Sequence, residues 1–200
     1  MIGRLRARAR SDDSGLTLVE IVIYISLSVV VGTIVVSMFI GTLKGQDQVT
    51  STTQATTQGQ LTATIIEKAM HNATAFAIAD GGNTLKVLTT LDEPCQQFTL
   101  QRNALASTPS REVYDFFVYG GAKLPVGTWP NASTGALASG IVLVDADHHT
   151  GIPFVLDGSS VKYTLWFATD PKSSTPDSPN VDFSAIVTPR GTGGNISSCS

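Results

Sequence analysis

Charged residues are scarce in this chain, and the motifs of common enzyme classes are missing from it. Only 14% of the 200 residues are Asp, Glu, Lys or Arg, which favours an exported β-rich protein over a cytosolic enzyme. The sequence has no G-x-S-x-G, no H-E-x-x-H and no phosphate-binding G-x-x-x-x-G-K, and its GTGG lacks the third glycine of a dinucleotide site. We therefore expect no enzymatic activity and no cofactor.

Basic residues are too few, outside the first fifteen positions, to form a nucleic-acid surface. Residues 1–15 hold four arginines and two aspartates, a formal charge of +2, whereas the remainder holds nine basic and fourteen acidic residues, a charge of −5. Nucleic-acid binding needs Lys and Arg to neutralise phosphates. Direct nucleic-acid binding is therefore not expected, and a small patch around Lys162 or Arg190 is the alternative.

A long apolar run follows the basic segment. Glu20 is the only charged residue between positions 18 and 43, and the run covers about 39 Å as a helix, more than the hydrocarbon core of a bilayer. No small-x-small site follows between residues 37 and 46, which argues against a cleaved secretory signal. The positive-inside rule places residues 1–15 in the cytoplasm and residues 45–200 beyond the cytoplasmic membrane.

The acid at the start of this run has a distinctive sequence context. The stretch GLTLVE, residues 15–20, follows the basic segment and opens the apolar helix. This junction resembles the processing site of type IV prepilins and pseudopilins. The resemblance implies cleavage between Gly15 and Leu16 by a prepilin peptidase, N-methylation of Leu16, and a role for Glu20 in subunit assembly. Leu16 departs from the phenylalanine that is commonest at the first mature position.

The chemistry of the two groups fits that assembly role. Cleavage exposes an ammonium at Leu16 in a low-dielectric setting, where an unpaired ammonium and an unpaired carboxylate are both costly. In this family the acid of one subunit meets the terminal amine of its neighbour. The alternative is that Glu20 is a tolerated interfacial acid whose carboxylate reaches the lipid headgroups.

Residues 16–44 are predicted to form the transmembrane and filament-core helix, and residues 45–79 its amphipathic continuation. Apolar residues recur at helical spacing in the second segment, at Leu61, Ile65, Ile66, Ala69, Met70, Ala73 and Phe76 or Ala77. Seven threonines between residues 46 and 64 leave the continuity of the helix open, because Thr is a mediocre helix former. Three glycines either bend the helix or act as small packing residues: Gly32, Gly41 and Gly45.

Residues 80–200 are predicted to form a β-rich head. Short runs rich in β-branched and aromatic residues alternate there with turn residues. The predicted strands lie within residues 85–91, 96–101, 112–119, 141–145, 153–156, 161–168 and 181–187. The expected fold is therefore α+β, with a long N-terminal helix packed on an antiparallel β-sheet head, as in pilins.

The head contains a pair of cysteines and a short run of acids and histidines, which predict a disulfide and a weak candidate cation site. Cys95 and Cys199 fall in the part expected outside the membrane, so a disulfide is predicted rather than two thiols, and no C-x-x-C indicates redox chemistry. Asp145 and Asp147, beside His148 and His149, are weak candidates for a cation site. Their spacing matches no ligand template and an acidic turn explains them equally, so no metal is expected.

Three functions remain. The leading one is a minor pilin or pseudopilin of a type IV pilus-like or type II secretion filament. Its partners would be the prepilin peptidase, other pilin subunits and the inner-membrane assembly platform. In particular, IIEKAMHNATAFAI, residues 65–78, and GIPFVLDGSSVKYTLWFA, residues 151–168, are similar to J-type minor pseudopilins. The second is a filament-displayed binding module for DNA uptake or adhesion. The third is a single-pass anchored protein that keeps residues 1–15.

Overall fold

The computed structural model describes residues 17–108, 111–125, 135–143, 151–170, 180–191 and 196–199. The chain divides into two units, Met1–Gln46 and Asp47–Ser200. A single long helix, α1 (Leu18–His71), contributes its first part to one unit and its second part to the other. In the second unit the helix packs on an antiparallel β-sheet, which confirms the predicted α+β fold.

Helix α1 is continuous through its threonine-rich stretch and through Gly32, Gly41 and Gly45. Hydroxyls along it donate to the backbone carbonyl four residues earlier, at 2.7–2.9 Å, from Thr33, Ser37, Thr42, Ser51, Thr53, Thr56, Thr57 and Thr64. These bonds satisfy the hydroxyls inside the helix, so the hydroxyls do not pull the backbone into other conformations. The threonine-rich stretch therefore does not interrupt the helix.

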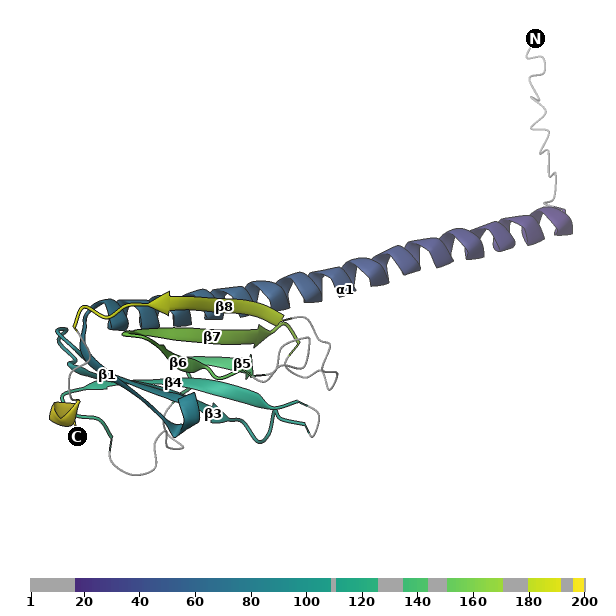
Figure 1. Cartoon of the computed structure of the whole chain (residues 1–200). Coiled ribbons are helices and arrows are strands. Elements are labelled where there is room, and N and C mark those ends of the chain that lie inside the picture. Colours follow the sequence, from purple (N-terminus) through teal and green to yellow (C-terminus); the bar gives the residue numbers. More distant parts are fainter. Residues whose placement is uncertain are drawn as a thin grey trace, which may run out of the picture. The chain divides into compact units, whose positions relative to one another are not determined.

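Eight strands of the described residues form one sheet (Figure 1). In chain order they are β1 (Ala73–Ala79), β2 (Thr84–Thr89), β3 (Cys95–Arg102), β4 (Val113–Gly121), β5 (Ala138–Val142), β6 (Phe154–Asp157), β7 (Ser160–Ala168) and β8 (Asn180–Val187). Strands β1 to β5 pair in succession, and β7 then pairs with β5, β6 and β8. Short 3₁₀ turns lie at Asp80–Gly82 and Ser197–Cys199. Each of the seven predicted strands overlaps an observed one; the strand predicted over residues 141–145 is β5, which begins earlier, at Ala138, and residues 144 and 145 lie outside the described residues.

The helix ends earlier than predicted. The predicted amphipathic helix over residues 45–79 stops at His71, and Ala73–Ala79 is strand β1, paired antiparallel with β2. Asn72 closes the helix, since its backbone N–H donates to the carbonyl of Ala69 and its side-chain amide to the carbonyl of Lys68. The helical spacing assigned to Ala73, Phe76 and Ala77 was therefore wrong, and strand pairing overrides it.

The buried face of α1 begins further toward its N-terminus than the predicted stripe. The buried residues recur every three or four positions from Ala55 to Ala69, and Met70 follows directly: Ala55, Gly59, Thr62, Ile66, Ala69 and Met70. Leu61, which the prediction placed on this face, is 46% exposed. Small side chains at the first three positions let the helix approach the sheet closely, whereas the prediction followed the large apolar residues.

The sheet contributes alternate residues to the core. Along β7 the buried side chains are Val161, Tyr163, Leu165 and Phe167, as expected for a strand with one face on the helix. The hydroxyl of Tyr163 donates to Oε1 of Glu67 on α1 at 2.7 Å. Burial and this bond raise the pKa of Tyr163, so the phenol remains a donor and ties the helix to the sheet.

The predicted disulfide is present. Cys95, at the start of β3, is bonded to Cys199, and their Cα atoms are 5.6 Å apart. Both cysteines are buried with Leu124, whose backbone N–H donates to the carbonyl of Cys199 at 2.8 Å. The bond therefore fastens the segment around Cys199 to the sheet.

A buried arginine that the sequence analysis did not single out connects two strands. Arg111 is 6% exposed, and its guanidinium donates to the carbonyl of Asp170 at 2.9 Å and to Oδ1 of Asn180 at 3.0 Å. Asp170 follows β7 and Asn180 begins β8. Burial lowers the pKa of Arg111 and nearby Asp170 opposes that shift. The guanidinium thus holds the two strand ends in place.

Gly59 allows us to test the close approach of the helix and β8. A methyl group at Gly59 would collide with the ring of Phe183. This ring packs edge-on against the ring of Phe167, with 5.7 Å between the ring centroids. We expect Gly59→Ala to destabilise the head by about 1–2 kcal/mol, because overpacking outweighs the better helix propensity of Ala. Chemical denaturation of the full chain in detergent micelles measures this change.

Two controls make the Gly59 test specific. In a Phe183→Ala background, Gly59→Ala should stabilise by about 0.5–1 kcal/mol, since only helix propensity remains. Gly45→Ala should not destabilise, because no described residue comes within 4 Å of its added methyl group. Destabilisation by Gly59→Ala in the Phe183→Ala background would contradict this account.

A substitution at Thr62 is expected to stabilise the head. Its side chain is fully buried, and its hydroxyl has no hydrogen-bond partner among the described residues. Thr62→Val keeps the shape and removes the buried hydroxyl, so it should raise the free energy of unfolding by about 1–2 kcal/mol. Thr64→Val is the control: exposed Thr64 already donates to the carbonyl of Gln60 and should show no gain. An equal gain at both positions would indicate that Val is favoured over Thr anywhere in this helix, and that the buried hydroxyl is not the cause.

Candidate functional site

The site that the sequence singled out lies in the first turn of α1. Thr17 precedes the helix, its hydroxyl accepts from the backbone N–H of Glu20 at 3.3 Å, and its carbonyl accepts from that of Ile21 at 3.2 Å. Thr17 is therefore the N-cap and Glu20 the third helical residue, the spacing of a capping box. The cap fixes where the helix begins relative to the carboxylate.

The Glu20 carboxylate is oriented from within its own helix. The hydroxyl of Tyr24, one turn further along, donates to Oε1 of Glu20 at 3.2 Å. A carboxylate in a first helical turn also interacts favourably with the helix dipole. Among the described residues, no Lys or Arg forms an ion pair with Glu20. The arrangement leaves an exposed carboxylate that can form an ion pair with a cation of another molecule.

Around this carboxylate the helix surface is apolar on every side. Eighteen large hydrophobic side chains between residues 18 and 43 are 44% to 79% exposed. By length and composition α1 can cross a membrane. A helix that is hydrophobic all round is buried in lipid or among other chains, and a single copy in water leaves that surface uncovered.

The other predicted site residues are distributed as follows. Gly15 and Leu16, the expected cleavage and methylation positions, lie outside the described residues, as do Asp145 and Asp147. The described ranges hold no group of three or more His, Cys, Asp or Glu side chains that could bind a metal. Cys95 and Cys199 have a structural position in the head.

Two residues of the site were missed in the sequence analysis. Thr17 was readable from the pattern T-x-x-E in residues 17–20, which signals a capping box. Tyr24 stands four positions after Glu20, the spacing at which side chains of a helix meet. Both signals are local patterns around Glu20, the single acid of the apolar run.

No family model, no curated protein and no solved structure matches this chain. What can be said of its function therefore rests on its residues and their geometry.

Proposed function

We propose that this chain is a structural subunit, a minor pilin or pseudopilin, of a filament assembled from the cytoplasmic membrane. The observation that carries the proposal is the capped, oriented carboxylate of Glu20 at the start of the long apolar run of α1, five residues after Gly15. The subunit works by assembly and catalyses no reaction itself.

The apolar helix supports assembly for an energetic reason. Covering a large hydrophobic side chain stabilises by about 1.5–3 kcal/mol, so the eighteen exposed ones need lipid or neighbouring helices around them. A filament core supplies helices of the same kind, so the helix can leave the bilayer without exposing this surface to water.

The carboxylate supports a specific partner. Inside an apolar core Glu20 needs a cation, and the body of the chain offers few. The new amino terminus of a neighbouring subunit, created at Leu16, is an ammonium of the right charge on the same helix. Pairing Glu20 with it sets the axial position of one subunit against the next, while Tyr24 holds the carboxylate.

In this proposal the chain has a defined orientation in the membrane and defined partners. Residues 1–15 face the cytoplasm and are removed by a prepilin peptidase, and the head lies outside, where the Cys95–Cys199 bond is favoured. The partners are other pilin or pseudopilin subunits, met through the helix, and an assembly platform in the inner membrane. The mature subunit then resides in a periplasmic or surface filament.

The deciding experiment is the intact mass and amino-terminal sequence of the membrane-extracted chain, from cells with and without the prepilin peptidase. The expected result is a chain that begins at N-methylated Leu16 only when the peptidase is present. A chain that still begins at Met1 in both strains would overturn the proposal and indicate an ordinary single-pass anchor.

A further inference from the structure

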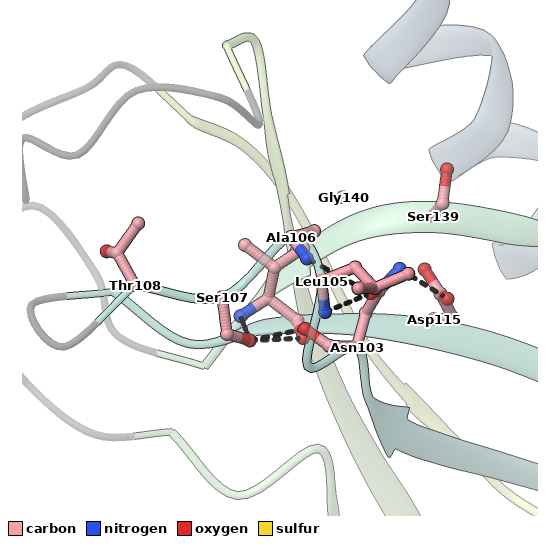
Figure 2. Close-up of a pocket in the computed structure, with 9 residues that line it drawn as sticks. Asn103, Leu105, Ala106, Ser107, Thr108, Asp115, Ser139 and Gly140 are labelled. Carbon is pink, nitrogen blue, oxygen red and sulfur yellow. Dashed lines mark hydrogen bonds between the residues drawn. The ribbon is translucent and has the colours of Figure 1, made fainter.

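A pocket of about 470 Å³ opens on the head, remote in sequence from α1 (Figure 2). Its lining comes from three segments: the turn after β3, residues 103–108; Val113 and Asp115 on β4; and Ser139 and Gly140 on β5. Tyr114 and Phe116, the alternate residues of β4, pack in the core with α1. Asp115 therefore points to the face of the sheet away from the helix.

A β-bulge shapes one wall of the pocket. Tyr114 pairs with Ile141 and Phe116 with Ala138, so Ser139 and Gly140 together stand opposite Asp115. Gly140 has a φ of 77°, a conformation that favours glycine. Bulges interrupt strand pairing and redirect neighbouring side chains, and this one lies beside Asp115.

The opposite wall is a turn held by Asn103. Its Oδ1 accepts from the backbone N–H groups of Leu105 and Ala106 at 3.0 and 3.1 Å, and its Nδ2 donates to Oδ2 of Asp115 at 2.9 Å. Figure 2 shows Asn103 between the turn and Asp115. One side chain thus shapes the turn and fixes the carboxylate.

The carboxylate of Asp115 is incompletely satisfied. Its Oδ1 is buried and has no hydrogen-bond partner among the described residues, and the described residues that line the pocket include no Lys or Arg. Burial raises the pKa of Asp115, and the bond from Asn103 opposes that shift. A half-buried carboxylate without a cation is unfavourable, and a ligand cation would relieve the cost.

The walls above the carboxylate are apolar. Leu105 at the rim is 100% exposed, and Ala106 and Val113 lie beside the carboxylate. An alkyl chain that ends in a cation matches this combination of apolar walls and a single acid. Ammonium fits better than guanidinium, because guanidinium pairs best with both oxygens of a carboxylate and Asn103 already occupies one.

We propose that this pocket binds an alkylammonium group, such as the lysine side chain of a partner protein, with Asp115 as its counter-ion. The ammonium lies against the Asp115 carboxylate, and the alkyl stem covers Ala106 and Leu105. This function of the head is independent of filament assembly through α1, and it would give a displayed head a binding surface.

The test uses the full chain in non-ionic micelles, uniformly labelled with ¹⁵N, and follows the amide signals of Ala106 and Gly140. The probes are N-acetyl-L-lysine N-methylamide and its norleucine analogue, which has a similar stem without the ammonium. The lysine probe should shift these signals saturably, and the norleucine probe should bind at least about tenfold more weakly, as expected for loss of a charge-assisted bond. n-Pentylamine distinguishes a free amine from a peptide, since backbone contacts would make the lysine probe bind more tightly.

Two variants locate the counter-ion. Asp115→Asn should weaken the lysine probe at least about tenfold, whereas Asp157→Asn, which removes the same charge from exposed β6, should leave it unchanged. Absence of saturable shifts, equal binding of the two amide probes, or equal effects of the two variants would overturn the proposal. The comparison of probes on the native chain decides the question even if Asp115→Asn misfolds.

Discussion

Replacing Glu20 with lysine is expected to reduce incorporation of the chain into filaments about 100-fold, while the head still folds. In the proposed pairing, the change removes the acceptor for a neighbouring amino terminus and places a second cation against it. Breaking a buried ion pair costs about 3–5 kcal/mol, which corresponds to a factor of 100 or more. The measurement is the amount of mature chain that copurifies with sheared filaments, relative to the amount in the membrane.

Asp47→Lys is the matched control for this prediction. It makes the same charge reversal at an exposed position on the same helix, just past the apolar run, and should leave incorporation unchanged. Glu20→Gln keeps the shape, removes the charge and should give an intermediate loss. Formation of the Cys95–Cys199 bond, seen on a non-reducing gel, reports that the head of each variant is folded. Normal incorporation of Glu20→Lys would eliminate the pairing of carboxylate and amino terminus.

Removal of the disulfide is expected to produce the largest loss of stability in the head. The bond closes a loop with a sequence separation of 104 residues. In the chain-entropy model a loop of this size limits the unfolded ensemble by about 4.7 kcal/mol. The double variant Cys95→Ser, Cys199→Ser should therefore lose about 4 kcal/mol of unfolding free energy, measured by chemical denaturation of the full chain in micelles.

Reduction provides the control for the double variant. A reductant should lower the stability of the native chain to that of the double variant, and it should not affect the variant itself. In both cases the hydrogen bond from Leu124 to the carbonyl of Cys199 should weaken, seen as faster amide exchange at Leu124. A loss below about 1 kcal/mol would mean that the residues around Cys199 hold to the sheet without the bond.

Seven strands of the head could be predicted from the sequence, but β1 could not. Seven strands show β-branched and aromatic residues between turn signals, so their pattern matches half-buried strands. Strand β1 is alanine-rich, and its Ala73, Phe76 and Ala77 also fit a helical period. Short apolar runs of small residues satisfy both periods, and only the pairing with β2 decides between them.

The two sites of the chain differ in how far the sequence predicts them. Glu20, Thr17 and Tyr24 are neighbours on one helix, so fixed sequence spacing determines which of them meet. The pocket at Asp115 joins segments from residues 103–108, β4 and β5, and it depends on a bulge and on the asparagine turn. No local sequence pattern predicts that these segments lie side by side, because the register of the strands brings them together.

The hydroxyl bonds along α1 affect how deeply the helix can sit in its surroundings. Their donors run from Thr33 in the apolar run to Thr64 in the head unit, and each of these hydroxyls is already bonded to its own helix. Apart from Lys44 and Asp47, no charged side chain lies between Glu20 and Glu67. Within the apolar run these bonds lower the cost of placing hydroxyls in lipid, so this part of the helix can sit in a bilayer up to the charged residues Lys44 and Asp47.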